Sequence, residues 1–461
     1  MASSARTIRR TPAPKPRSVF TNRSFLLLWL AQLISQSAQN AILFTLLIIM
    51  TKLTKGSTYS SVLVLSFVIP SVVFGIFSGV VVDLWSKRLL LIWTNVARML
   101  LAICFLFARD HVSLLILISV FFATSSQFFG TTDAVTVPSV VPKEQLMAAN
   151  SMFSMAVTGS QLAGMIFLAP ILLPTVGEVW LFAIAALMFG VAVACAWLMP
   201  PISEGDAAPD RSLPTFREFR SAAGDYMNTL RSLAKDPVST LALIHYATGS
   251  SMVLLFAVLV PRYMQAVLKI SPDKAVTIFA PVGVGAILGL RALPSIASRF
   301  GKNRTVIIGL VGLSLAVVAI GLVDPIARGL KTTEHLNPFG SGGERAGGLS
   351  ILVLLTMAFA GPLGFAYALV NAPAQTVLHE RAPAEVRGRV FAAQVVLANA
   401  VGILPLIAAG SVADIFGVAP VLFAIAAVMG TIAGFSIYFE AKWSTGIRPA
   451  PPGASPGGTP L

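Results

Sequence analysis

The chain has 461 residues, of which 56% are hydrophobic and only 11% carry a charge. Soluble domains carry roughly 25% charged residues, so the composition excludes an ordinary soluble protein. The formal net charge of +14 would suggest a nucleic-acid partner in a soluble protein, but in a membrane protein the placement of the cations matters more, and we expect no nucleic-acid partner.

Apolar runs follow one another from Ser24 to Phe439, and each has about the 20 residues that a helix needs to cross ~30 Å of hydrocarbon. The sequence therefore predicts an all-α polytopic membrane protein with 12 transmembrane helices. The predicted spans are residues 24–50, 58–82, 89–108, 113–141, 148–172, 179–198, 239–260, 275–297, 305–323, 350–372, 390–412 and 418–439.

The Lys and Arg residues are divided unevenly between the two sides of this layout. Of the 33, 22 lie on the side of the termini, nine lie on the other side, and Arg98 and Arg291 lie within spans. Cytoplasmic loops of membrane proteins are enriched in Lys and Arg, so we expect both termini to be cytoplasmic.

Two stretches of sequence recur at corresponding places, which indicates an internal duplication. Residues 79–88 follow the second span and correspond to 298–304 after the eighth, while 142–144 follow the fourth span and correspond to 383–385 after the tenth. We therefore predict two pseudo-symmetric six-helix bundles. The expected domains are a basic cytoplasmic N-terminal tail (1–23), an N-terminal bundle (24–199), a cytoplasmic linker (200–238), a C-terminal bundle (239–440) and a disordered cytoplasmic tail (441–461).

The linker between the bundles carries apolar residues at helical spacing, with arginines among them. This pattern predicts an amphipathic helix along the cytoplasmic face, acting as a structural strap or, alternatively, as a regulatory site. The apolar positions are Phe216, Phe219, Tyr226, Leu230 and Leu233.

The clearest family signature follows the second span. The pattern Gly79-x-x-x-Asp83-x-x-Ser86-Lys87-Arg88, with six plus six spans and a basic central loop, resembles the major facilitator superfamily. Stretches that begin at Trp29, Pro138 and Pro373 look like the branch that holds macrolide efflux pumps and enterobactin-type siderophore exporters. The resemblance implies the major facilitator fold in a cell membrane, here a bacterial plasma membrane. It also implies proton-driven alternating access, with a cavity between the bundles that opens to one face at a time.

The same motif supplies charges that can bias a conformational equilibrium. Gly79 permits close approach of helices, and Asp83 can contact Lys87 and Arg88 at the cytoplasmic rim in one conformation only. Counting residues along the third and fourth spans places Asp133 level with Arg88, which adds Asp133 to the expected gating set.

Two observations qualify this expectation. Lys87 and Arg88 also serve as cations that set the topology, and this alone is the alternative to a gating role. The second copy of the motif has Ser298 where the first has Asp83, so any charge latch is expected mainly in the N-terminal half.

Polar and ionisable residues inside spans are costly unless they face a cavity or a partner, so they mark candidate sites. The first span carries a polar stripe at helical spacing, and the seventh carries a shorter one. In the resembled fold these spans line the cavity; hydrogen bonding between helices is the alternative role. The expected substrate-cavity residues are Gln32, Gln36, Gln39, Arg98, His245, Thr248 and Arg291.

Proton coupling needs a titratable group within the spans. Gln39 stands where the resembled branch commonly has an acid, which leaves Asp133 and His245 as candidate carriers. For Asp133 the alternatives are a cytoplasmic latch with Lys87 or Arg88, or a counter-ion for a cationic substrate.

We therefore expect a secondary active transporter, a proton-coupled exporter of a bulky, partly lipophilic organic compound such as a drug, macrolide or siderophore. The alternatives are uptake or facilitated transport of a nutrient or lipid precursor and, from another class, a membrane enzyme or receptor. No catalytic triad, metal-ligand or phosphate-loop spacing occurs, so we expect no enzyme, cofactor or metal site. The expected partners are a small organic substrate, protons and membrane lipid, with the monomer as the functional unit.

Overall fold

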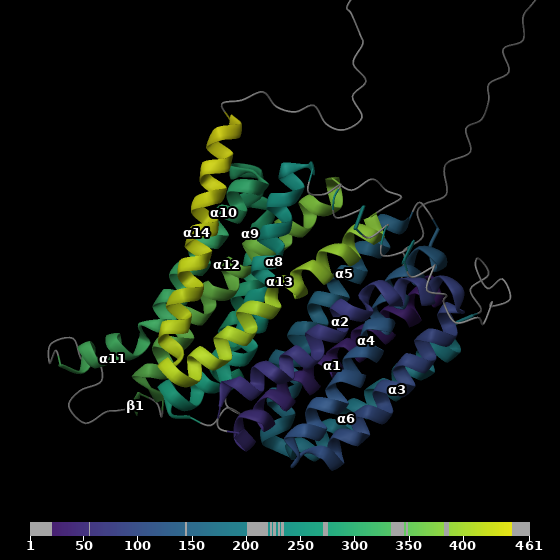
Figure 1. The fold of residues 1–461 in the computed structure, drawn as a ribbon, viewed down its shortest axis with the longest axis horizontal. Helices are drawn as coiled ribbons and strands as arrows, with labels where there is room; N and C mark the ends of the chain where they lie inside the picture. The colour runs from purple at the N-terminus through teal and green to yellow at the C-terminus, as the bar shows by residue number, and fades with distance from the viewer. Residues whose placement is uncertain are drawn as a thin grey trace, which may run out of the picture.

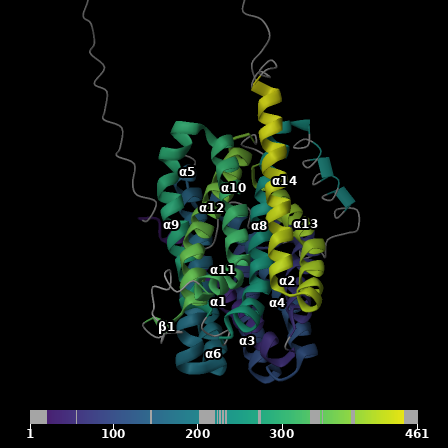
Figure 2. The same cartoon turned by 90° about the vertical axis from the view of Figure 1, so that its left-hand side faces the viewer.

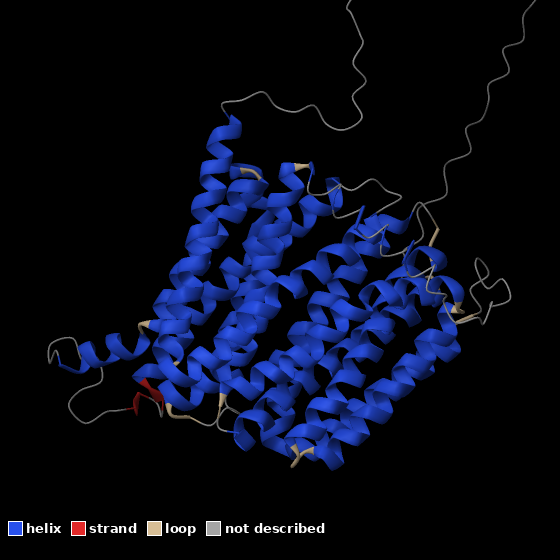
Figure 3. Ribbon diagram, viewed as in Figure 1, coloured by secondary structure: helices blue, strands red, loops and turns tan. Residues whose placement is uncertain are grey.

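The computed structural model is built almost entirely of helices (Figure 3). It describes isolated positions between 220 and 231 and the ranges 21–54, 56–142, 145–200, 235–270, 275–332, 345–346, 349–381 and 387–444. The predicted linker helix and both predicted tails lie largely outside the described residues.

The helices of the N-terminal half are long and apolar. They are α1 (Arg23–Thr54), α2 (Ser57–Leu84), α3 (Lys87–Ala108), α4 (Val112–Val140), α5 (Leu146–Leu162), the π-helix η3 (Ala163–Leu168) and α6 (Ala169–Leu198). Among them α1 has the most deeply buried membrane-spanning stretch, and it contacts α2, α4, α5, η3 and α6.

The C-terminal half repeats this arrangement with one insertion. Its helices are α8 (Pro237–Tyr263), the π-helix η4 (Met264–Leu268), α9 (Ala275–Phe300), α10 (Lys302–Gly321), α11 (Val323–Thr332), α12 (Ile351–Arg381), α13 (Arg387–Phe416) and α14 (Val418–Ser444). The helices of this half run roughly parallel to one another in Figure 2. The insertion holds α11 and the antiparallel strands β1 (Arg345–Ala346) and β2 (Leu349–Ser350), a small departure from the all-α expectation.

Eleven helical segments of the described residues are long and apolar enough to cross a membrane. The predicted span 148–172 is the one without a counterpart among them, because it is divided between the 17-residue α5, η3 and the start of α6. Gly177 turns the chain inside α6 with a φ of 82°, a conformation that glycine adopts without strain. The polytopic α-helical architecture is confirmed, while the count of twelve spans stays a prediction.

The helices begin and end at two opposite faces of the molecule. We call the face that carries Arg23 and Ser444 the terminal face, and the face that carries Thr54 and Phe416 the distal face. Figure 1 shows α11 and β1 at the end of the molecule away from the C-terminal end of α14. The insertion therefore lies at the distal face.

The two halves meet chiefly along α2 and α13. Asn399 of α13 donates a hydrogen bond to the hydroxyl of Ser71 (Nδ2 to Oγ, 2.9 Å). A Cβ atom at Gly75 would lie 2.6 Å from a methyl carbon of Val396, so the absence of a side chain there permits the contact. These contacts form the main seam between the two halves, and α1 and α2 with α8, and η3 with α9, add smaller contacts.

Candidate functional site

The most deeply buried cation of the described chain is Arg98 on α3, whose exposed fraction is 0%. Its guanidinium carbon lies 3.9 Å from the ring centroid of Phe129 on α4 and 4.9 Å from that of Phe189 on α6. A desolvated cation over an aromatic face gains about 2 kcal/mol, which offsets part of the cost of burial. Three helices of the N-terminal half thus enclose one charge.

Two amides hold the same guanidinium. Arg98 Nη2 donates to Oδ1 of Asn95, one turn earlier on α3, at 2.6 Å. Arg98 Nη1 donates a longer bond of 3.4 Å to Oε1 of Gln39 on α1, while Nε has no hydrogen-bond partner among the described residues. The arginine is therefore positioned by α1 and α3 but is not fully satisfied.

Asp133 on α4 is also completely buried, and it interacts electrostatically with Arg98. Neither of its carboxylate oxygens accepts a hydrogen bond from the described part of the chain. A buried carboxyl group without a donor is costly when ionised, so the nearby guanidinium is the main group that favours its charge. Arg98 and Asp133 form what we call the buried pair.

The expected pairing of Asp133 with Lys87 or Arg88 is not made among the described residues in this conformation. Residue counting compares only Cα levels, whereas side chains lean toward the N-terminus of their own helix. Because α3 and α4 are antiparallel, the side chain of Arg98 leans toward the terminal face and that of Asp133 leans toward the distal face. The two side chains therefore lean toward each other, in line with the electrostatic interaction between them.

The cations of the expected gating motif have other partners. Lys87 Nζ donates to the hydroxyl of Ser139 at 2.8 Å, and Arg88 donates to the backbone carbonyls of Ala196 and Trp197. These bonds join α3 to α4 and α6 within the N-terminal half. The side chain of Asp83 lies outside the described residues, and its contact with Lys87 and Arg88 stays a prediction.

Gly79 faces open space on the described chain, because a Cβ atom placed there would meet no described atom within 4 Å. The close approach expected at this glycine is therefore not made in this conformation. On the C-terminal side, where no latch was expected, Lys302 pairs with Glu380 at 2.5 Å and Arg304 with Glu440 at 2.8 Å. Both pairs lie within one half, so they stabilise that bundle at the terminal face.

The polar residues of the α1 stripe make different contacts. Gln39 reaches Arg98, as described, while the backbone carbonyl of Gln36 accepts a hydrogen bond from Asn40 at 2.8 Å. Gln32 is buried, and its Oε1 has no partner among the described residues. Gln32 is thus an unsatisfied polar group on the same helix as Gln39.

The expected cavity residues of the C-terminal half do not gather on one face. His245 is buried on α8, and its Nε2 lies 2.8 Å from the hydroxyl of Ser436 on α14. The Thr248 hydroxyl donates to the carbonyl of Ile244 on its own helix, and the side chain of Arg291 is exposed on α9. His245 makes a hydrogen bond between helices, which was the alternative role, and it lies in a different half from Asp133.

Comparison with known proteins decides the family. The sequence profile described as Major Facilitator Superfamily matches residues 28–405. The chain belongs to the Major Facilitator Superfamily. It is therefore a multi-pass membrane transporter, as expected from the residues around Asp83.

One curated relative and two solved structures are similar to the chain. The multidrug efflux pump Tap of Mycolicibacterium fortuitum is 25% identical over 215 residues; the match covers 46% of this chain and 44% of Tap. It thus spans less than half of the relative's length. The nucleoside transporter NupG aligns with a TM-score of 0.64 at 15% identity, covering 90% of this chain and 98% or more of that one. A POT family transporter in complex with a thioalcohol-conjugated peptide aligns with a TM-score of 0.67 at 12% identity, covering 91% of this chain and 96% of that one. At these identities the two structures indicate the fold alone.

The structure also brings together residues that sequence reasoning missed. Asn371 of α12 donates to the hydroxyl of Tyr367 at 2.9 Å, and the hydroxyl of Tyr246 on α8 bonds with Ser250. Electrostatic interaction links the two tyrosines. Tyr246 lies beside His245, so the polar pattern of the seventh span contained part of the signal. Tyr367 and Asn371 share a helix face four residues apart.

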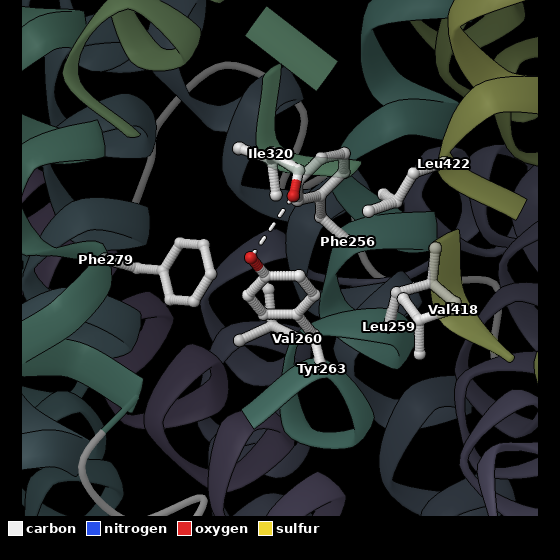
Figure 4. Close-up of a pocket in the computed structure, with 8 residues that line it drawn as sticks. All are labelled: Phe256, Leu259, Val260, Tyr263, Phe279, Ile320, Val418 and Leu422. Carbon is white, nitrogen blue, oxygen red and sulfur yellow. Dashed lines mark hydrogen bonds between the residues drawn. The ribbon is translucent and has the colours of Figure 1, made fainter. Parts of the chain in front are cut away.

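A small pocket lies elsewhere, near the distal face of the C-terminal half (Figure 4). Its lining is apolar except for Tyr263, whose hydroxyl donates to the carbonyl of Ile320 at 3.2 Å and lies 3.2 Å from Thr356 Oγ1. The residues that line the pocket belong to the C-terminal half, whereas the buried pair lies in the N-terminal half. The pocket is therefore separate from the buried pair.

Proposed function

We propose that this chain is a proton-coupled exporter of a bulky, partly lipophilic organic compound, which works by alternating access. The buried pair carries the proposal. A carboxyl group without a hydrogen-bond donor and an incompletely satisfied arginine are energetically costly inside a membrane protein, so such residues mark a functional site. The similarity to the multidrug efflux pump Tap supports export as the direction.

The arrangement around Arg98 supports a role for Asp133 as the proton carrier. Burial opposes the charge of Asp133 and Arg98 favours it, so the proton affinity depends on where the guanidinium is held. Gln39 and Asn95 hold the guanidinium now. A movement of α1 relative to α3 would change the distance between the two charges and with it the protonation of Asp133.

The same movement links the proton to the substrate. Gln32, Gln36 and Gln39 lie on α1, and a substrate that engages the amide of Gln39 would compete with Arg98 for its Oε1. Arg98 released from Gln39 is free to approach Asp133 and to favour loss of the proton. In this scheme substrate and proton are exchanged through one arginine.

We further propose that the terminal face is cytoplasmic, as the distribution of Lys and Arg indicates. Large aromatic side chains on the outer surface, Trp93, Phe107, Trp180 and Trp197 among them, are suited to contact with lipid. With this orientation the α2–α13 seam closes the extracytoplasmic side. We infer that a substrate would enter such a state from the cytoplasm.

Transport by reconstituted protein tests this proposal. Proteoliposomes with an imposed proton gradient are offered a panel of macrolides, siderophores and lipophilic cations, with and without an uncoupler. We expect accumulation of at least one compound that collapses when the uncoupler is added. Accumulation indifferent to the uncoupler would contradict proton coupling, and movement only in the direction of the cytoplasm would favour uptake instead.

A further inference from the structure

The N-terminus of α2 is capped by a residue of the opposite half. The first backbone N–H groups of a helix have no partner within the helix, and a polar side chain at the N-cap position usually accepts a bond from one of them. The N-cap residue of α2 is Gly56, which makes no such bond. Instead Asp414 of α13 accepts hydrogen bonds from the backbone N–H of Ser57 (Oδ1, 2.7 Å) and of Thr58 (Oδ2, 2.8 Å).

Further contacts make this cap strong. The hydroxyl of Thr58 donates to Oδ2 of Asp414 at 2.7 Å, so one carboxylate accepts three hydrogen bonds from α2. The negative charge also lies at the positive end of the α2 helix dipole. On its own half, Asp414 has Arg262 of α8, whose Nε lies 3.8 Å from Oδ1. Asp414 thus remains anchored to the C-terminal half while it binds the N-terminal half.

Two glycines near the cap, Gly56 and Gly410, permit its close contacts. A Cβ atom at Gly56 would lie 3.1 Å from Oδ2 of Asp414, so a larger residue at this position would crowd the carboxylate. One turn further along α2, the buried Ser61 packs against Gly410 of α13, where a Cβ atom would overlap the serine hydroxyl. The cap and this small-residue contact occupy the distal end of the α2–α13 seam.

We propose that Asp414 is the latch of the distal gate, which closes that face by capping α2 and releases it when the two halves separate there. This inference rests on the proposed alternating access. Opening of the distal face must part α2 from α13 and break all three hydrogen bonds at once, whereas the Arg262 contact within the C-terminal half can persist. A small set of contacts that exists in only one of two states can bias such an equilibrium.

The position of Asp414 allows this exchange at moderate cost. Its side chain is 25% exposed, so water can replace the α2 donors when the gate opens. The gate is therefore formed by groups that are satisfied in both states. This distinguishes Asp414 from the buried pair, where no described donor satisfies the carboxylate.

Cysteine labelling in lipid nanodiscs tests the latch, after Cys104 and Cys195 are replaced by serine. Ser61→Cys reports opening of the distal gate, because Ser61 is buried against α13, and Gly79→Cys reports the terminal side, where described atoms leave open space. We expect Asp414→Ala to raise the maleimide labelling rate at position 61 about fivefold, as loss of a cap would, and to lower the rate at position 79. Thr58→Val should give a smaller change in the same directions.

The matched control is Glu178→Gln. Glu178 pairs with Lys52 at 2.8 Å near the distal face, but both residues belong to the N-terminal half, so its loss should leave both labelling rates unchanged. Equal labelling at position 61 with and without Asp414 would overturn the latch. A rise at both positions would overturn it as well, because it would indicate general loosening of the fold.

The transport assay in proteoliposomes, run beside the labelling in nanodiscs, separates this inference from the proposed function. If the labelling rates shift in opposite directions while the wild-type protein shows no uncoupler-sensitive accumulation, the latch stands and the proton-coupled export fails. If the wild-type protein accumulates substrate but Asp414→Ala leaves the labelling at position 61 unchanged, the transport proposal stands and the latch fails.

Discussion

The guanidinium carbon of Arg98 lies 3.9 Å from the centre of the Phe129 ring. Phe129 precedes Asp133 by four residues on α4. α4 therefore presents to one buried cation both an aromatic face and, one turn on, a carboxyl group. Phe189 of α6 covers the cation from another helix. The charge is enclosed by groups that attract it, and this arrangement leads to the first prediction.

Arg98→Met should destabilise the protein by about 3–5 kcal/mol, because it leaves Asp133 buried without a compensating charge. Arg98→Met combined with Asp133→Leu should be more stable than Arg98→Met alone, since the second change removes the uncompensated group. Thermal unfolding in one detergent, followed for the wild type, both single variants and the double variant, measures the coupling between the two positions. Strictly additive losses would show that the two residues do not interact.

Much of the fold could be predicted from the sequence, because long apolar runs are a strong signal for membrane-spanning helices. Stretches of apolar residues long enough to cross a bilayer predicted helices that the structure contains, and the turn at Gly177 falls within the predicted boundary between 172 and 179. A helix satisfies its backbone hydrogen bonds within one segment, so an apolar run long enough to cross a bilayer as a helix predicts that secondary structure.

The site was harder to predict because its contacts depend on tilt, rotation and side-chain direction. Arg98, Asp133 and Gln39 were all singled out for being polar within spans, yet no pairing among them was expected. Side-chain direction on antiparallel helices brought the first two together, and the rotation of α1 added the third. Asp414 was missed because an acid near the end of a span resembles an ordinary loop charge in sequence.

His245→Gln should leave uncoupler-sensitive transport intact. The imidazole bonds to Ser436 within the C-terminal half, so its loss is expected to cost about 1 kcal/mol of stability rather than proton coupling. The expected result is a lower midpoint of thermal unfolding with an unchanged response to the uncoupler, and Ser436→Ala should behave in the same way. Loss of coupling in His245→Gln but not in Ser436→Ala would restore the histidine as a carrier.

The terminal face should be cytoplasmic. A reporter that is active only in the cytoplasm is expected to be active when fused after Leu461, and a reporter inserted at Asp110, in the turn between α3 and α4, is expected to be inactive. An alkaline phosphatase reporter should give the opposite pattern. Activity of the cytoplasmic reporter at Asp110 would invert the orientation and, with it, the side that the α2–α13 seam closes.

Asp133→Asn should abolish concentrative transport while leaving exchange of substrate down its gradient. The amide keeps the shape of the carboxyl group but cannot bind and release a proton, so the gradient can no longer drive accumulation. The measurements are accumulation under an imposed proton gradient and counterflow of labelled substrate without one, in the same proteoliposomes. Asp110→Asn is the matched control, because Asp110 is exposed in a loop and pairs only loosely with its neighbour Arg109 at 3.6 Å. If the Asp133→Asn variant still concentrates substrate in an uncoupler-sensitive manner, Asp133 is not the carrier. If the variant is impaired in both measurements, the buried pair has a structural or gating role instead.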